Sequence, residues 1–307
     1  MKVLSFSAYD DLGGAGWNTA TAFNRHRPDW TYRAVRGAPS YLQFPEHTAW
    51  DWGDICRWFE DSDVVHLHDG YHAIPTVSRF VCTYHGVGFR EQPAHFLRTQ
   101  TELRATGLVS TLDLWLLAPD DVQWAPAAHD LDWYAELRSA YLASPTVAEQ
   151  GNNRRLRIGH APTDRGRKNT AEFLTACERI AAEHPIDVVL IEGVPWREAL
   201  ALKATCDVFY DQVAYGYGGS AIEAWGMGQP VVCGAHDTTL EEYRRRFGYV
   251  PFVEADAGTI EPALRQLLDP YTREVYAARG RAHVERFHSY PAVVDLLEPI
   301  YRQAAGA

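Results

Sequence analysis

The stretch Tyr217-Gly-Gly-Ser-Ala-Ile-Glu-Ala-Trp-Gly-Met-Gly-Gln-Pro-Val-Val232 decides the fold, because it predicts a helix followed at once by a buried strand. The helix is expected over residues 220–227, since Gly228 suits its C-cap and Pro230 cannot continue it. The apolar run at 230–233 then predicts a short strand that is buried on both faces. A helix that leads directly into such a strand is typical of α/β proteins.

The start of this helix predicts an anion site. Gly218, Gly219 and Ser220 carry backbone amides that have no partner within the helix, and the helix dipole adds partial positive charge there. Glycine also lets an anion approach the backbone without meeting a Cβ atom. Glu223 follows one turn later and is expected on the accessible face, within reach of a ribose. The alternative is an ordinary helix start in an α/β protein.

Short apolar strands alternate with helices along the whole chain. In the first half, strands are expected at 3–6, 31–35, 63–68 and 80–84, and helices at 17–24 and 50–61. In the second half, strands are expected at 157–159, 186–191, 208–210 and 230–233, and helices at 169–183, 196–205 and 220–227. A last helix is expected at 290–304. This alternation predicts parallel sheets that are covered on both faces.

The length of 307 residues exceeds what one hydrophobic core usually supports, so two domains are expected. A linker is expected at 144–153, because this segment contains Pro145, Gly151 and a pair of asparagines. The predicted domains are therefore 1–150 and 151–307, and each has the strand and helix pattern of a Rossmann-like half.

The composition argues against several classes of protein. A formal net charge of −11 disfavours a large basic face for nucleic acid or anionic lipid. Two basic runs, at 154–157 and 244–246, are either local patches or solvated surface, and the lack of interleaved aromatic residues favours solvated surface. The five cysteines form no Cys-x-x-Cys pair, which predicts reduced thiols and a cytoplasmic protein. We expect neither a leader nor a membrane-spanning segment.

A resemblance to a known family adds to this picture. Glu223-Ala-Trp-Gly-Met-Gly-Gln-Pro-Val231 resembles the donor-binding signature of retaining glycosyltransferases of the GT-B fold, family 4 type. The family's signature has another glutamate eight residues earlier, which helps to hold the donor sugar; this chain has Tyr215 there. The resemblance implies two Rossmann-like domains whose parallel sheets face an interdomain cleft, with the acceptor side first and the nucleotide-sugar domain second. It also implies that the helix at 290–304 crosses back to the first domain.

The loop Gly159-His-Ala-Pro-Thr-Asp-Arg-Gly-Arg-Lys-Asn169 is a second candidate site, because it joins a strand to a helix. Arg165 and Lys168 place two cations at a strand's carboxyl end, where open α/β sheets bind ligands. Such cations can stabilise a diphosphate leaving group. The loop resembles the basic pair of the family's donor domain, which usually has glycine at the position of Asn169. The alternative is a solvated surface loop.

Two further strand ends carry candidate donor-binding residues. Gly193 and Val194 follow the strand at 186–191, and similar loops in the family pack beside the nucleobase. Asp211 follows the strand at 208–210, where the resemblance implies a place near the donor sugar. The alternatives are a plain turn into the next helix and a helix cap at Asp211.

In the first half, the candidate catalytic residue is His85. The sequence Thr83-Tyr-His-Gly86 puts an imidazole at a strand end, similar to the family's histidine near the sugar and phosphate; the alternative is a structural histidine. Gly13 and Gly14 follow the first strand and are expected to cradle the phosphate or to admit the acceptor. Their loop lacks the spacing G-x-G-x-x-G, which disfavours a nicotinamide enzyme.

A possible metal pair, His66 and His68, stands on the strand at 63–68. We expect one of the two to be buried and the other exposed. They would bind a metal only if both faced the same way beside a carboxylate. Because Asp69 and His72 follow closely, the hypothesis of a metal site or an acceptor site stays open.

The family resemblance implies a hexosyltransferase that moves a sugar from a nucleoside-diphosphate sugar to an acceptor hydroxyl with retained configuration. His85, Arg165 and Lys168 would be its catalytic residues. Because these cations replace a metal, no metal and no cofactor are expected. The alternatives are a nucleotide-sugar epimerase or hydrolase, a non-catalytic nucleotide-sugar binder, and a phage-type glucosyltransferase that acts on hydroxymethylated DNA bases. The acceptor stays open among a glycan, a small molecule and modified DNA.

Overall fold

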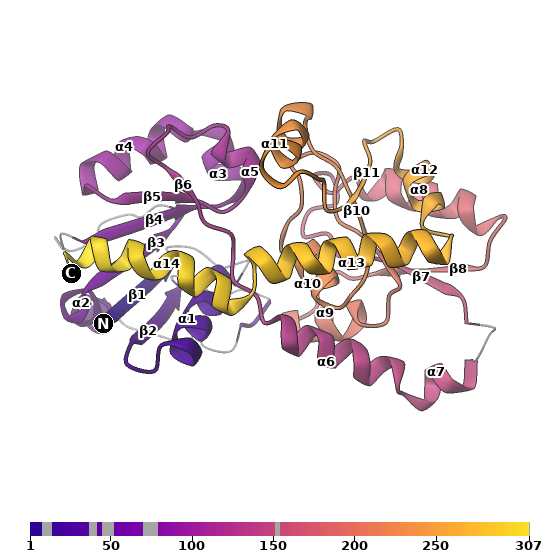
Figure 1. The fold of residues 1–307 in the computed structure, drawn as a ribbon, viewed down its shortest axis with the longest axis horizontal. Helices are drawn as coiled ribbons and strands as arrows, with labels where there is room; N and C mark the ends of the chain where they lie inside the picture. Colours follow the sequence, from indigo (N-terminus) through magenta and orange to yellow (C-terminus); the bar gives the residue numbers. More distant parts are fainter. Residues whose placement is uncertain (8–13, 37–41, 45–51, 70–78, 151–153, 307) are drawn as a thin grey trace. The chain divides into compact units, whose positions relative to one another are not determined.

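The computed structural model describes residues 1–7, 14–36, 42–44, 52–69, 79–150 and 154–306. They form two compact units, each built on its own parallel sheet (Figure 1). Unit 1 comprises Met1–His129 together with Phe287–Ala307, and unit 2 comprises Asp130–Arg286. Unit 1 is therefore discontinuous in sequence, and unit 2 is inserted into it.

The sheet of unit 1 has six parallel strands in the order β2-β1-β3-β4-β5-β6. These strands are β1 (Lys2–Ser7), β2 (Thr31–Arg36), β3 (Val64–His68), β4 (Phe80–Tyr84), β5 (Thr106–Val109) and β6 (Gln123–Trp124). Every residue of β3 and β4 is buried, because helices cover both faces of the sheet. The four strands expected here from the sequence are all present; β5 and β6 were not expected.

The helices of unit 1 are α1 (Ala15–His26), α2 (Trp52–Asp61), α3 (Gly86–Glu91), α4 (Pro93–Leu103), α5 (Leu112–Trp115) and α14 (Tyr290–Ala305). Helices α1 and α14 lie side by side on one face of the sheet (Figure 1). They enclose a core that contains Phe23, Tyr32 and Tyr301. The opposite face of the sheet packs against a second core that contains Ile55 and Phe59 of α2.

The sheet of unit 2 has five parallel strands in the order β11-β10-β9-β7-β8. These strands are β7 (Leu156–His160), β8 (Ile186–Leu190), β9 (Val208–Tyr210), β10 (Val231–Cys233) and β11 (Val253–Glu254). Its helices are α6 (Leu131–Leu142), α7 (Pro145–Gln150), α8 (Thr170–Ala181), α9 (Trp196–Lys203), α10 (Gly219–Gly226), α11 (Asp237–Phe247), α12 (Ile260–Gln266) and α13 (Pro270–Phe287). The helix and strand predicted from residues 217–232 are α10 and β10.

The two units do not divide at residue 150. The chain passes from unit 1 to unit 2 between His129 and Asp130, and most of the segment expected as a linker is the helix α7. Helix α6 belongs to unit 2, because Tyr134 packs against Gly226 of α10 and the Arg138 guanidinium donates to the carbonyl of Ala204. The terminal helix α14 belongs to unit 1.

The strand orders locate the crevices in which open α/β sheets bind ligands. In unit 1, β1 lies between β2 and β3, so the chain reverses its direction of travel across the sheet at β1 and β3. In unit 2, the same reversal occurs between β7 and β9. Loops at the carboxyl ends of these strands diverge and leave a crevice between them. The loops after β7 and β9 carry Lys168 and Asp211, and the loops after β1 and β3 carry Gly14 and Asp69.

Candidate nucleotide-sugar site

Three predicted site residues of unit 2 meet at the crevice between β7 and β9. The Lys168 ammonium donates to one carboxylate oxygen of Asp211, and the amide of Gly218 donates to the other oxygen at 2.7 Å. Asp211 is 1 % exposed, whereas Lys168 keeps 18 % of its side chain exposed. The Lys168 Nζ atom lies 3.8 Å from the place that a Cβ atom on Gly218 would occupy. A partly exposed cation is therefore fixed beside the entrance of α10.

The entrance of α10 presents free backbone donors beside that cation. Gly218 is the N-cap residue, and no side chain among the described residues caps the helix there. The first amides of a helix have no intrahelical acceptor, so those of Gly219 and Ser220 are available to a ligand. Gly219 is exposed and Ser220 is half-buried. Peptide donors, the helix dipole and the Lys168 ammonium together favour an anion at this point.

The backbone conformation of Asn169 sets the turn between Lys168 and helix α8. Its backbone is left-handed, with φ 50° and ψ 41°, and it forms the N-cap of α8. Glycine adopts this conformation most easily, and asparagine is among the few other residues that tolerate it. The difference from the family's usual glycine therefore preserves the backbone geometry.

Glu223 does not lie on an accessible face, which corrects the sequence-based expectation. It is 6 % exposed, and its two carboxylate oxygens accept from the Trp196 indole at 2.7 Å and from the Lys203 ammonium. Lys203 also donates to the Ser220 hydroxyl at 3.0 Å. The reason is that α10 is buried on nearly all sides from Ala221 to Gly226, so a carboxylate within it requires a buried cation.

Arg165 reaches the end of the neighbouring strand β8. Its guanidinium makes a two-pronged bond to Glu192 at 2.8 and 2.5 Å, and this bond lowers the pKa of Glu192. Arg165 is 61 % exposed, so donors that do not contact Glu192 face solvent. Gly193 follows with a left-handed φ of 65° and open space around its α-carbon, and Val194 is half-buried. These residues line the carboxyl end of β8 next to that of β7.

Tyr215 occupies the position of the family's first glutamate. It is half-buried, its backbone forms an isolated antiparallel bridge with Ala235, and its ring lies edge-on to His236 with centroids 6.1 Å apart. This aromatic side chain gives the loop before α10 no carboxylate at that position.

His85 lies at the carboxyl end of β4 in unit 1 and is half-buried. Its Nε2 atom is 2.9 Å from Nδ1 of His68, and its amide donates to the Asp69 carboxylate at 2.5 Å. Asp69 itself has a left-handed φ of 56°. Burial lowers the pKa of His85 to about 4, so its imidazole is neutral at pH 7. The ends of β3 and β4 are thus held together by two side-chain bonds.

The expectation that one of His66 and His68 would be exposed is wrong, because both are buried and their ring centroids are 4.3 Å apart. Residues two apart on a strand share a face, and helices cover both faces of this sheet. In the described part of the chain, no three His, Cys, Asp or Glu residues are grouped to hold a metal ion. Gly13 and His72 lie outside the described residues. Gly14 is left-handed with φ 62° and packs so closely on Phe44 that a Cβ atom would collide with its ring.

Sequence reasoning missed several residues that shape the two sites. Lys203 carried the clearest signal, because it is the one charged residue in the run 199–206. Ser5 and Trp196 carried none, since a serine in a strand and a tryptophan at a helix start have many ordinary roles. His160 is also buried: it bonds to the Tyr210 carbonyl at 3.1 Å and the Thr170 hydroxyl at 2.9 Å, and burial lowers its pKa to about 4.

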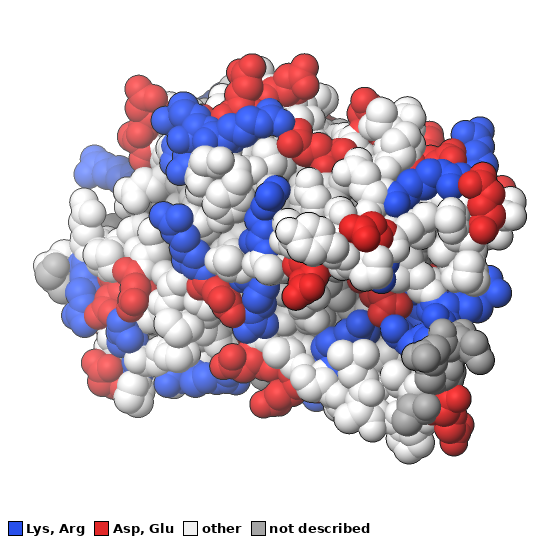
Figure 2. Space-filling model, turned by 45° about the vertical axis from the view of Figure 1, so that its right-hand side comes forward, with Lys and Arg blue, Asp and Glu red and all other residues white. Residues whose placement is uncertain are grey.

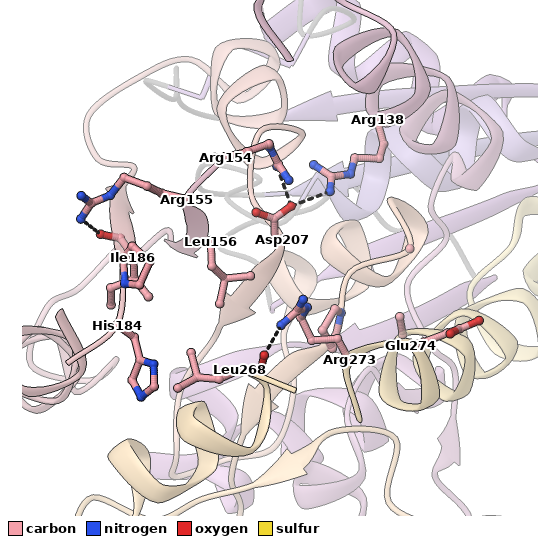
Figure 3. Close-up of a pocket in the computed structure, with 14 residues that line it drawn as sticks. Arg138, Arg154, Arg155, Leu156, His184, Ile186, Asp207, Leu268, Arg273 and Glu274 are labelled. Carbon is pink, nitrogen blue, oxygen red and sulfur yellow. Dashed lines mark hydrogen bonds and ion pairs between the residues drawn. The ribbon is translucent and has the colours of Figure 1, made fainter. Parts of the chain in front are cut away.

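A cavity of about 550 Å³ lies at the opposite, amino-terminal edge of the unit 2 sheet (Figure 3). Arg138 and Arg154 converge there on one oxygen of Asp207, at 3.0 and 2.6 Å. The guanidinium of Arg273 donates to the carbonyls of Leu267 and Leu268. The arginines thus bind carbonyls and a carboxylate where helices end and strands begin, and the run at 154–157 is only partly solvated.

The charges of the surface are mixed. On the face drawn in Figure 2, Lys and Arg side chains lie among Asp and Glu side chains. The run at 244–246 pairs with acids as well: Arg244 contacts Glu254, and Arg245 and Arg246 contact Glu242. None of the helices within the described residues combines the length and the apolar character needed to cross a membrane.

Comparisons with known proteins agree with this architecture. No family model matches the chain, and no curated protein matches it in sequence. Among solved structures it is similar to a glycosyltransferase from Rickettsia africae, with 11 % identity, a TM-score of 0.63, and coverage of 99 % of this chain and 98 % of that one. HepE from Anabaena, solved with UDP and glucose, has 13 % identity, a TM-score of 0.63 and coverage of 98 % and 99 %.

A third similar structure is an α-glucosyltransferase in complex with UDP and a 13-mer DNA. It has 12 % identity, a TM-score of 0.62 and coverage of 98 % of this chain and 99 % of that one. At such identities the similarity concerns the fold, and it extends over both units. With its two parallel-sheet α/β units, the chain has the GT-B fold.

Proposed function

We propose that the protein is a glycosyltransferase that moves a sugar from a nucleoside diphosphate to an acceptor hydroxyl with retained anomeric configuration. The observation that carries this proposal is the cluster of Lys168, Asp211 and Gly218 at the reversal point of the unit 2 sheet. The UDP bound in two of the similar structures supports a nucleotide donor.

The proposed diphosphate site consists of the Lys168 ammonium and the amides of Gly219 and Ser220. Asp211 uses one of the three ammonium donors, so the others are available to phosphate oxygens. Arg165 supplies further exposed donors from the same loop. When the bond between the sugar and the diphosphate breaks, negative charge grows on the leaving group. Donors that are already fixed in place stabilise that charge without reorganising.

We assign Glu223 an indirect role. The resemblance implied a bond to the ribose hydroxyls, but both of its carboxylate oxygens already bind Trp196 and Lys203. In the proposed site it holds Lys203, and Lys203 holds the hydroxyl of Ser220 at the helix entrance. The mechanism is front-face transfer, in which the leaving diphosphate accepts the proton of the acceptor hydroxyl. His85 is proposed to contact the sugar or the diphosphate.

The first test measures binding of UDP, GDP, ADP and dTDP by thermal shift and calorimetry, since a ligand that binds only the native state raises the melting temperature. Lys168→Met removes the cation, so affinity for the preferred nucleotide should fall about 10- to 100-fold, as a lost charged hydrogen bond predicts. The matched control is Arg167→Ala on the same loop, because the Arg167 side chain is 54 % exposed and its guanidinium lies 3.9 Å from Asp164. Equal affinity in all three proteins would contradict the site.

The second test identifies the reaction with sugar nucleotides and a panel of acceptors, analysed by NMR of the anomeric carbon. A product with the donor's configuration supports a retaining transferase, and an inverted product contradicts retention. Free sugar or an epimerised nucleotide without acceptor would instead identify a hydrolase or an epimerase. Binding without any turnover would identify a non-catalytic binder. Transfer to hydroxymethylated DNA, with salt-dependent binding, would identify DNA as the acceptor.

A further inference from the structure

A continuous chain of hydrogen bonds runs through the core of unit 1 to His85. The Ser5 hydroxyl is 2.9 Å from Nε2 of His68, and Nδ1 of His68 is 2.9 Å from Nε2 of His85. The rings of His68 and His85 are stacked, with centroids 5.2 Å apart and an interplanar angle of 20°. Ser5 is 1 % exposed and His68 is 5 % exposed, so water does not replace these bonds. Buried polar groups are costly unless they are bonded in this way.

The chain continues beyond Ser5. The Tyr32 hydroxyl interacts with Ser5, and it lies 2.9 Å from the Tyr301 hydroxyl of α14 and 3.1 Å from Nδ1 of His66. The Tyr301 hydroxyl is 2.7 Å from Nδ1 of His66, whose Nε2 atom is 2.6 Å from the Thr83 hydroxyl. Among the described residues, none of the groups in this series of hydrogen bonds is a carboxylate. Asp69, the acid that follows His68 in the sequence, accepts from the amide of His85.

Neutral histidines restrict where the protons can be. Burial lowers the pKa values of His66, His68 and His85, so each ring carries one N–H and one lone pair at pH 7. A bond between two neutral rings then has only two arrangements. Either His68 donates from Nδ1 to His85, or His85 donates from Nε2 to His68. The first arrangement leaves an N–H on Nδ1 of His85, and the second leaves a lone pair there.

The hydroxyl groups favour the first arrangement. A phenol is a better donor than an aliphatic hydroxyl and a poorer acceptor, and an unprotonated imidazole nitrogen is a strong acceptor. Two phenols lie near Nδ1 of His66, and Tyr301 at 2.7 Å is closer than Tyr32 at 3.1 Å, so Tyr301 donates to that nitrogen. Tyr32 therefore donates to Ser5, and Ser5 donates to Nε2 of His68. The proton of His68 is then on Nδ1, from which it is donated to Nε2 of His85. The remaining proton of His85 must be on Nδ1.

We propose that Ser5 and His68 are positioning residues, which hold His85 as a neutral imidazole with an N–H at Nδ1 that is directed to an oxygen of the bound substrate. Neither residue contacts the substrate itself. A neutral donor of this kind can bind a phosphate or sugar oxygen without taking part in proton transfer. The choice of that oxygen rests on the proposed function, whereas the tautomer of His85 does not.

The test reads the tautomer directly, by long-range ¹H–¹⁵N NMR at pH 7 on protein labelled at its 13 histidines. The His85→Gln variant assigns the signals of His85 by their loss. In the wild type, His85 is expected as the Nδ1–H form. In Ser5→Ala, which removes a donor and adds no volume, that form should lose its dominance and fall to a mixture. In Ser5→Thr, which keeps the hydroxyl, it should be restored.

The matched control is Thr19→Val, which removes a hydroxyl of similar burial that donates to the Ala15 carbonyl within α1 and is no part of this series of hydrogen bonds. It should leave the tautomer of His85 unchanged. A wild-type His85 in the Nε2–H form, or the same tautomer in wild type and Ser5→Ala, would overturn the proposal. If Ser5→Ala does not fold, the wild-type tautomer still decides between the two arrangements.

Kinetic measurements on the same variants test whether the tautomer of His85 affects the reaction. If transfer is observed, Ser5→Ala should lower kcat/KM at least several-fold, and Thr19→Val should not. Unchanged kinetics in Ser5→Ala with an altered tautomer would overturn the substrate contact at Nδ1. If no transfer occurs with any donor, the proposed function fails, while the tautomer measurement stands independently.

Discussion

Lys203 and Glu223 form the most deeply buried ion pair among the described residues, with side chains 4 % and 8 % exposed. Removing two charges from water is costly, and only good geometry with further hydrogen bonds offsets the loss. Here Trp196 and Ser220 supply those bonds. The pair therefore ties α9 to the first turn of α10, directly beneath the proposed phosphate site.

Glu223→Gln should destabilise unit 2 by about 3–5 kcal/mol, because it leaves the Lys203 ammonium buried without its partner. Adding Lys203→Met should recover much of the loss, since the double variant has no buried charge. Urea denaturation of both single variants and the double variant measures this coupling. The control is Glu254→Gln, whose partner Arg244 is half exposed, and its cost should be about 0–1 kcal/mol. Equal costs at both sites would contradict the role of burial.

The left-handed backbone of Asn169 leads to a second prediction at this scale. Asn169→Gly should keep or raise stability, whereas Asn169→Val should cost about 1–2 kcal/mol, because a β-branched side chain is strained at φ 50°. Thermal unfolding measures the difference. Ala171→Val, at an exposed position with ordinary helical geometry in α8, serves to separate backbone strain from the effect of a valine. A stable Asn169→Val variant would show that the loop does not need this conformation.

At the scale of elements, helix α13 packs on α10 through a glycine. A Cβ atom on Gly280 would lie 2.0 Å from the ring of Trp225, which is fully buried and has no room to move away. Apart from this glycine, α13 buries only His283 and Val284 over its 18 residues. The contact depends on backbone proximity rather than on an apolar stripe.

Gly280→Ala should therefore destabilise unit 2 by about 1–3 kcal/mol, as overpacking of a core does. Helix propensity alone predicts that the alanine stabilises the helix by about 1 kcal/mol. A net decrease in the free energy of unfolding would therefore be due to the collision with Trp225. The control is Gly258→Ala, where the nearest atom to a new Cβ is 3.4 Å away. Denaturant unfolding compares the two variants, and a stabilised Gly280→Ala would contradict the packing described.

The elements also indicate what a sequence can predict. The eight strands expected from apolar runs are all present, because buried parallel strands give a strong signal. Strands β6 and β11 have two residues each and give almost no pattern, and α13 lacks the apolar stripe by which helices are recognised. The meeting of Lys168 with Asp211 was predictable from strand ends. The pairing of Glu223 with Lys203 was not, because it depends on how α9 packs on α10.

At the scale of the whole molecule, buried histidines make stability depend on pH. Burial lowers the pKa of His66 and His288 to about 3 and that of His85 and His160 to about 4. An unfolded histidine has a pKa near 6.5, so below that pH the unfolded chain binds protons that the folded chain does not. Stability is therefore complete above pH 6.5 and falls as the pH drops toward 4.

The free energy of unfolding should fall steadily between pH 6.5 and 5, by about 1.4 kcal/mol per pH unit for each such histidine, and the melting temperature should fall with it. This window lies above the range in which the carboxylates titrate, so histidines dominate it. His160→Gln should reduce this dependence on pH by the contribution of one histidine. Calorimetry of the wild type and this variant across the range measures the difference. A melting temperature that is constant from pH 7 to 5 would contradict the buried, neutral state of these rings.

The return of α14 to unit 1 has a consequence for biosynthesis. The chain leaves unit 1 at His129 and re-enters it beside the same point, since the amide of His129 donates to the carbonyl of His288 at 2.8 Å. Domains fold as units while the chain is made, and all of unit 2 emerges from the ribosome before α14 does. Until α14 has also emerged, the six-stranded sheet of unit 1 lacks the helix whose Tyr301 packs on Phe23 and Tyr32. We therefore expect unit 1 to complete its core after unit 2 has been synthesised.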